Sequence, residues 1–211
     1  MMNKEKIKIL FVVDMHGSKS AFDRVLEKAR NVDIVIDAGD FTFFSENIKP
    51  ILKRYNSIKK QILITHGNHE NREEVDFLCK KCKNLTFLHK KIYEYKNLIF
   101  YFYGGGGFAI KEIELEDYIP KIKKRFSAFK KKHKNARTII IFHGPPYKTN
   151  LDMMPFGHVG SKSKTKLIKA IKPNVVIAGH IHECEYKKEL IGKTFLLNPG
   201  PRGRIITFNK D

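Results

Sequence analysis

The sequence contains no tryptophan, few cysteines and no long apolar run. Its three cysteines, Cys79, Cys82 and Cys184, are too few for a disulfide framework, and the C-x-x-C at 79–82 has no second pair to complete a zinc ribbon. The apolar run at residues 9–13 is far shorter than the roughly 20 residues that span a bilayer, and no small-residue cleavage site follows it. We therefore expect a cytoplasmic protein that has no membrane partner and no disulfide framework.

Acidic residues are also scarce. The chain has 22 Asp and Glu against 41 Lys and Arg, which gives a formal net charge of +19. Such a charge attracts polyanions, so nucleic acid is one candidate partner, although charge alone does not make binding specific. A general enrichment in lysine, as in some thermophile proteomes, explains the same charge without any such partner. The composition leaves both interpretations open.

Short apolar runs that favour strands alternate with amphipathic helical segments along the 211 residues, a pattern typical of an α/β domain. No repeat or low-complexity linker divides them, so we expect one domain over residues 1–211. The predicted strands are residues 8–13, 33–37, 61–65, 98–103, 138–142, 175–178, 194–197 and 204–208. The predicted helices are residues 18–30, 50–58, 71–81, 120–134 and 162–171, with Pro50 and Pro120 in first turns, where proline is tolerated.

Polar side chains that can bind metals follow the ends of five predicted strands. Asp14, Asp40, Asn68, His143 and His180 each lie within about three residues of the end of such a strand. α/β folds place their ligands at the carboxyl ends of strands. This repeated position predicts that the five side chains meet at one functional site.

The segments around these residues form an ordered set of short motifs. They are D-x-H at 14–16, GD at 39–40, GNHE at 67–70, HG at 143–144 and GHxH at 179–182. Each motif is weak alone, but the five in this order resemble the calcineurin-like metallophosphoesterases over most of the chain. The resemblance implies an α/β fold built as a four-layer α-β-β-α sandwich of two mixed sheets, with metals between the strand ends.

The donor types indicate which metals such a site would take. Carboxylate, imidazole and amide oxygen suit divalent Mn, Fe, Co, Ni or Zn, and manganese is the ion we expect to serve best in an assay. Seven ligands are too many for one ion, but they divide evenly between two ions if one carboxylate bridges. The resemblance implies that Asp14, His16 and His182 hold the first ion, that Asn68, His143 and His180 hold the second, and that Asp40 bridges both.

The resemblance also implies a mechanism. A hydroxide bridging the two ions attacks the phosphorus of a phosphate ester. His69 is adjacent to Asn68 on an extended backbone and is not needed as a ligand. It resembles the family histidine that protonates the leaving oxygen, and we therefore expect it to act as general acid.

The chain departs from the phosphoprotein phosphatases of this superfamily, which carry GDxxDR where residues 39–44 read GDFTFF. Its short length and the NPGP at 198–201 are closer to the small metallophosphoesterases, so we expect a small phosphate ester as substrate, and a diester rather than a monoester. Two alternatives remain open: a nuclease-like enzyme guided by the basic charge, and a weakly active metal-binding regulator. Substrate choice is expected to depend on loops such as residues 41–48 and 145–160.

Overall fold

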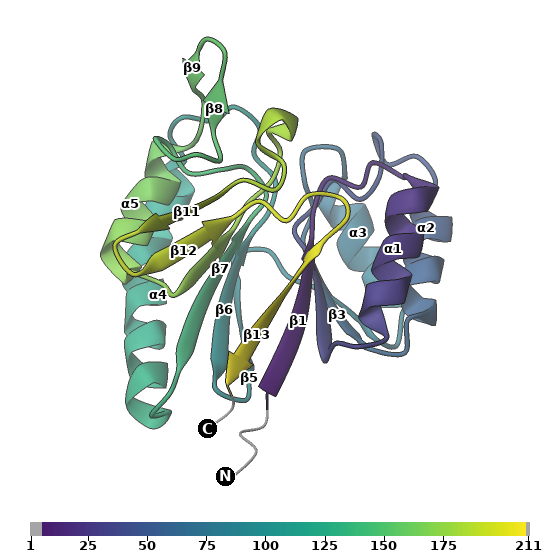
Figure 1. Cartoon of the computed structure of the whole chain (residues 1–211), viewed down its shortest axis with the longest axis horizontal. Coiled ribbons are helices and arrows are strands. Elements are labelled where there is room, and N and C mark those ends of the chain that lie inside the picture. The colour runs from purple at the N-terminus through teal and green to yellow at the C-terminus, as the bar shows by residue number, and fades with distance from the viewer. Residues whose placement is uncertain (1–5, 210–211) are drawn as a thin grey trace.

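Residues 6–209, which the computed structural model describes, form two β-sheets packed face to face with helices on both outer sides (Figure 1). Helices α1 (Lys19–Ala29), α2 (Ile48–Ser57) and α3 (Arg72–Cys79) lie against one sheet. Helices α4 (Ile113–Lys132) and α5 (Lys162–Ile171) lie against the other. The layers therefore run helix, sheet, sheet, helix, which confirms the predicted four-layer sandwich.

The first sheet has the strand order β13-β1-β2-β3-β4. Its strands are β1 (Lys6–Val12), β2 (Ile34–Asp37), β3 (Gln61–Ile64), β4 (Leu85–Phe87) and β13 (Arg204–Asn209). Strands β1 to β4 are parallel to one another, whereas β13 returns antiparallel to β1. The carboxyl ends of β1, β2 and β3 therefore lie at the same edge of the sheet.

The second sheet has the order β11-β12-β10-β7-β6-β5. Its strands are β5 (Lys91–Tyr95), β6 (Leu98–Tyr103), β7 (Arg137–Phe142), β10 (Val175–Ile177), β11 (Lys188–Ile191) and β12 (Thr194–Leu197). The four inner strands are parallel, and each outer strand pairs antiparallel. Two further strands, β8 (Met153–Met154) and β9 (Gly157–His158), form a hairpin that projects from the top of Figure 1, and η1 (His182–Cys184) is a short 3₁₀ helix.

Three apolar layers separate the four layers of backbone. In β1, Leu10 and Val12 pack with the cluster beneath α1 to α3, while Ile9 and Phe11 pack with the cluster between the sheets. Successive side chains of a strand point to opposite faces, so a strand covered on both sides needs apolar residues at every position. This is why the inner strands read as continuous apolar runs rather than alternating ones. A third cluster joins the second sheet to α4 and α5.

The predicted strands and helices are all present, but several edge strands were not predicted. Strands β4, β5 and β11 are short, and β5 and β11 are partly exposed along their length. Their sequences therefore lack the apolar run that revealed the inner strands. They pair with the neighbouring inner strand through its backbone N–H and C=O groups, which would otherwise have no partner in the sheet.

The start of α4 differs from the prediction. The helix begins at Ile113, and Pro120 lies inside it rather than in its first turn. Leu115 and Ile119, which precede the proline, are buried against the second sheet, so packing extends the helix backwards past a residue that normally disfavours it. The placement of Pro50 in the first turn of α2 is confirmed.

The cysteines Cys79, Cys82 and Cys184 are free thiols, so no disulfide joins them. None of the helices within residues 6–209 combines the length and the apolar character that crossing a bilayer requires.

Candidate metal centre

The carboxyl ends of strands from both sheets meet at one rim of the sandwich. The loops after β1, β2 and β3 carry Asp14 and His16, Asp40, and Asn68 with His69, while those after β7 and β10 carry His143, His180 and His182. Every residue predicted for the site lies on one of these loops, except His182, which begins η1 directly after the loop that follows β10. The topology alone therefore brings together side chains that are up to 168 positions apart in the sequence, from Asp14 to His182.

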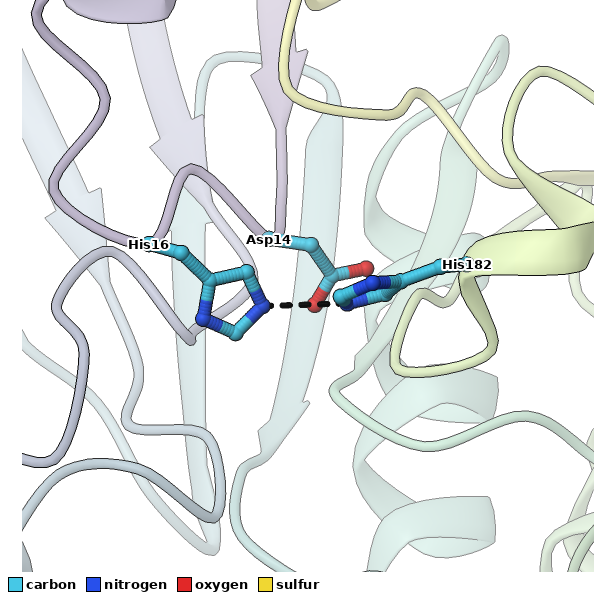
Figure 2. A group of neighbouring side chains, drawn as sticks. All are labelled: Asp14, His16 and His182. Atoms are coloured by element: carbon cyan, nitrogen blue, oxygen red, sulfur yellow. Dashed lines mark hydrogen bonds between the residues drawn. The ribbon is translucent and has the colours of Figure 1, made fainter.

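Asp14, His16 and His182 form the first group that could hold an ion (Figure 2). One ligand atom from each residue lies within 4.8 Å of the others, and the Nε2 atoms of His16 and His182 are 3.0 Å apart. In Figure 2 the carboxylate of Asp14 and the two imidazole rings point toward a common position. This geometry suits three donors around one cation.

Asp40 belongs to two further groups, one with His143 and His180 and one with His16 and His69. Its Oδ2 atom lies 3.3 Å from His143 Nε2, 3.9 Å from His16 Nε2 and 3.8 Å from His69 Nε2. Asn68 completes the cluster, because its Oδ1 lies 2.9 Å from His143 Nε2. The structure thus brings all eight predicted residues together, with the Asp40 carboxylate in the middle.

The buried polar atoms of this cluster fit bound cations. Among residues 6–209, Asp14 Oδ1, His16 Nδ1 and His180 Nε2 are buried side-chain atoms without a hydrogen-bond partner. Leaving a buried polar group unpaired costs about 1–3 kcal/mol, and a bound ion is one way to remove that cost. A divalent ion accepts the lone pairs that Asp14 Oδ1 and His180 Nε2 leave unused, and the donor set fits two such ions.

Burial and charge set the protonation of these groups in the metal-free protein. Burial raises the pKa of Asp14 to about 7. Burial also raises the pKa of Asp40, but hydrogen bonds and charge from His143 and His69 together outweigh it and bring that pKa down to about 2. Burial lowers the pKa of His180 to about 4, which leaves its imidazole neutral and able to bind metal at neutral pH.

Several of the proposed ligands have a left-handed backbone, which is unusual for residues other than glycine. The φ angles are 57° at Asp14, 44° at His16, 53° at Asp40 and 71° at His180. Each such residue costs of order 1–3 kcal/mol and persists only where the surroundings hold it. Hydrogen bonds from the backbone N–H of Asp14 to Gly39 O and from His16 N–H to Asp40 O, at 3.0 and 2.9 Å, tie two of the loops together.

Glycine is required beside two of the ligands because the loops approach so closely. A Cβ atom at Gly67 would lie 1.9 Å from Asp40 Oδ1, and one at Gly179 would lie 2.5 Å from Asp14 Oδ2. Both distances are far below van der Waals contact. The glycines of the GNHE and GHxH motifs therefore let one ligand loop pack directly against the carboxylate of another.

Glu70 supports the loops that carry the proposed ligands, although it is not among those ligands. Its buried carboxylate accepts hydrogen bonds from the backbone N–H of Asp40 (3.0 Å) and of Gly67 (2.8 Å), and from the N–H and hydroxyl of Thr42 (2.8 and 2.7 Å). It thereby joins the loop after β2 to the loop after β3. In the sequence, only the position of Glu70 as the last residue of the GNHE motif points to this role.

A cavity of about 370 Å³ lies beside the first group of ligands. Its lining includes Asp14, His16 and His182 together with Arg24 and Arg202. Two arginines next to the candidate metal centre suit an anionic substrate, since arginine pairs well with phosphate oxygens.

The model of one family, calcineurin-like phosphoesterase, matches residues 7–184. Among solved structures, the fold is similar to TT1561 of Thermus thermophilus, with 17% identity, a TM-score of 0.68 and coverage of 97% of this chain and 99% of that one. It is also similar to a dimetal phosphatase from Danio rerio, with 10% identity, a TM-score of 0.61 and coverage of 90% and 86%. No curated protein matches the chain in sequence at a significant level.

The structural matches are too low in identity to show more than the fold, but the family model spans most of the chain. That match covers each motif from Asp14 to His182. The chain belongs to the calcineurin-like phosphoesterase family.

Proposed function

We propose that this protein is a two-metal phosphodiesterase that hydrolyses a small phosphate ester. The observation that carries the proposal is the position of Asp40, whose Oδ2 lies between the rings of His143, His16 and His69 at 3.3 to 3.9 Å. A carboxylate in that position can be shared by two cations, each of which has its own further donors.

The donors divide between two ions as follows. Asp14, His16 and His182 would hold the first, Asn68, His143 and His180 would hold the second, and Asp40 would contact both. When bound, a pair of divalent ions supplies Lewis-acid polarisation of the phosphoryl oxygens and lowers the pKa of an attacking water. Manganese fits the donor set, as do iron, cobalt, nickel and zinc.

The hydrogen bonds of His143 and His69 support different roles for the two rings. His143 Nδ1 lies 3.1 Å from the carbonyl oxygen of Ala38, which can only accept, so the neutral ring carries its proton on Nδ1. When Nε2 carries no proton, its lone pair faces Asn68 Oδ1 and Asp40 Oδ2, at 2.9 and 3.3 Å, which are the oxygens proposed to bind the same ion. Hydrogen-bonded backbone carbonyls orient metal-binding histidines in this way.

His69 has the opposite arrangement. The backbone N–H of Phe44 donates to His69 Nδ1 at 3.3 Å, so the neutral ring carries its proton on Nε2. That nitrogen faces the centre, 3.8 Å from Asp40 Oδ2. Nε2 is therefore the ring nitrogen within reach of the reacting group, and from the imidazolium form it would give its proton to the leaving oxygen and leave a neutral ring, which supports His69 as the general acid.

The openness of the rim supports a diester substrate. His182 is exposed and the His16 side chain keeps 19% of its surface accessible, so the first group of ligands faces solvent. A diester carries a substituent on each side of the phosphorus, and an open rim leaves room for both. The arginines at the neighbouring cavity suit the remaining negative charge.

The test is metal analysis of protein purified without chelator, followed by assay after chelation and reloading with each ion. We expect about two equivalents of metal per chain and faster hydrolysis of bis(p-nitrophenyl) phosphate than of p-nitrophenyl phosphate. Faster monoester hydrolysis would overturn the diester preference. Full metal loading without hydrolysis of either ester, or of single-stranded DNA, would instead indicate a metal-binding regulator.

A further inference from the structure

The loop between β2 and α2 exposes two phenylalanines beside the metal centre. Phe43 keeps 49% and Phe44 keeps 66% of its surface accessible, although large apolar side chains are normally buried. The Phe44 ring lies 4.2 Å from the His69 ring, and the Phe43 ring lies 5.4 Å from it, between centroids. Phe43 also approaches the ring of His16 at 6.3 Å. The exposed apolar surface is thus in direct contact with the site.

The backbone of this loop is strained and firmly tethered. Phe44, Ser45 and Asn47 all have left-handed φ angles, of 47°, 62° and 54°. Phe44 N–H donates to His69 Nδ1 at 3.3 Å, and the Ser45 hydroxyl donates to the carbonyl oxygen of His69 at 3.4 Å. Strain of this kind persists where the fold over-determines a conformation, typically at ligand-binding sites. The loop is therefore built to hold these two rings against His69.

We propose that Phe43 and Phe44 bind a planar aromatic ring in the leaving group of the substrate. The substrate class is then a phosphate ester of an alcohol that carries such a ring, as a nucleoside does. This inference rests on the proposed function, because it takes His69 as the residue that protonates the leaving oxygen. Rings that touch His69 lie beside the departing alcohol rather than beside the part of the substrate that keeps the phosphate.

The geometry of the pair favours a flat ligand. The two rings are 4.8 Å apart and nearly perpendicular, at 77°, so a third ring can stack on one face while it meets the edge of the other. Aromatic rings prefer offset-stacked and edge-to-face contacts of this kind. Every nucleobase has a face that can stack on an aromatic side chain.

The experiment compares two diesters with the same leaving oxygen: the methyl esters of adenosine 5′-phosphate and of ribose 5-phosphate. In the manganese-loaded protein, release of adenosine should be at least about tenfold more efficient, in kcat/KM, than release of ribose. Phe44→Ala should remove most of this preference, whereas Phe44→Tyr, which keeps a ring, should retain it. Phe77→Ala is the matched control, because Phe77 is 57% exposed but lies on α3.

The ribose ester separates substrate binding from disturbance of His69. If Phe44→Ala lowers the efficiency on both esters equally, Phe44 only supports His69 and the inference is overturned. Equal efficiency of the unchanged protein on both esters would overturn it as well. Failure of that protein to hydrolyse any phosphate ester would instead contradict the proposed function.

A binding measurement tests the inference without turnover. The chain has no tryptophan, so Phe44→Trp introduces a single indole fluorophore at the site. We expect adenosine 5′-monophosphate to quench its emission and ribose 5-phosphate to leave it unchanged. Quenching by both ligands or by neither would overturn the inference, and quenching by the adenosine ligand alone would support it even in protein without activity.

Discussion

Asp40 lies where the two groups of proposed ligands meet. Its Oδ2 faces the histidine rings, and its Oδ1 accepts the backbone N–H of His69 at 2.9 Å, which orients the carboxylate. If two cations share this carboxylate, its negative charge offsets part of the positive charge of both. Its loss is therefore expected to affect both ions, whereas loss of a terminal ligand affects one.

Asp40→Ala should reduce bound metal from about two equivalents to well below one per chain and abolish hydrolysis. His182→Ala is the matched control. His182 is proposed to bind the first ion alone, so this variant should retain the second ion. Elemental analysis of both proteins after reloading with manganese checks this. Two equivalents of metal together with most of the activity in Asp40→Ala would contradict the bridging assignment.

His69→Ala should have an effect that depends on the leaving group. A nitrophenolate departs without a proton, but an alkoxide does not, so the variant should lose little rate on a nitrophenyl ester and on the order of 100-fold or more on an alkyl ester. Metal content should stay at the wild-type level. Equal losses on both esters, or loss of metal, would mean that His69 acts through structure or coordination.

The ligand loops are elements that hold one another in place. Glu70 links the loop after β2 to the loop after β3 through four hydrogen bonds, which it accepts from the backbone N–H groups of Asp40 and Gly67 and from the N–H and hydroxyl of Thr42. The distance between Asp40 and Asn68 therefore depends on a carboxylate that is not among the proposed ligands.

Glu70→Gln should weaken metal binding about 10- to 100-fold. The substitution replaces one carboxylate oxygen, which accepts hydrogen bonds, by an NH₂ group, which cannot accept them from the backbone N–H groups. The free energy of unfolding should fall by about 1–3 kcal/mol. Glu73→Gln, at a carboxylate with 77% of its side chain exposed, is the control and should change neither quantity. Metal titration and urea unfolding check the pair, and unchanged metal affinity in Glu70→Gln would refute the role.

Helix α4 carries an exposed proline in its interior. Proline at such a position lacks the N–H of a helical hydrogen bond and is about 3 kcal/mol less favourable than alanine. Pro120→Ala should therefore raise the free energy of unfolding by about 1–3 kcal/mol, while exposed Lys124→Ala should change it by less than about 0.5 kcal/mol. A loss of stability in Pro120→Ala would mean that Ile119 and Ile122 need the proline between them in order to pack.

At the scale of the whole molecule, the net charge of +19 acts on any polyanion, whatever the site accepts. Binding of single-stranded DNA should weaken by on the order of 10-fold or more between 50 and 200 mM salt, because each neutralised phosphate releases counterions. Fluorescence anisotropy across a salt series measures this. Micromolar or tighter binding that persists at physiological salt and is accompanied by cleavage would make nucleic acid the substrate.

The sequence pattern indicated an α/β fold with one site at its strand ends, and the resemblance to the calcineurin-like metallophosphoesterases implied the four layers and the residues of the candidate site. Inner strands must be apolar at every position because both of their faces are covered, and metal-binding side chains at strand ends are visible as local motifs. Asp14, His16, Asp40, Asn68 and His143 could therefore be identified before their distances were known. Local patterns of this kind need no knowledge of which segments become neighbours.

The tertiary structure decided what depends on contacts between distant segments. The edge strands, the start of α4 before Pro120, the four hydrogen bonds of Glu70 and the proximity of Phe44 to His69 all arise from such contacts. No pattern in the sequence shows which residues Glu70 or Phe44 will contact. Only the packing of the loop after β2 against the loop after β3 gives these residues their roles, because hydrogen bonds and ring contacts act over a few ångströms in space rather than along the chain.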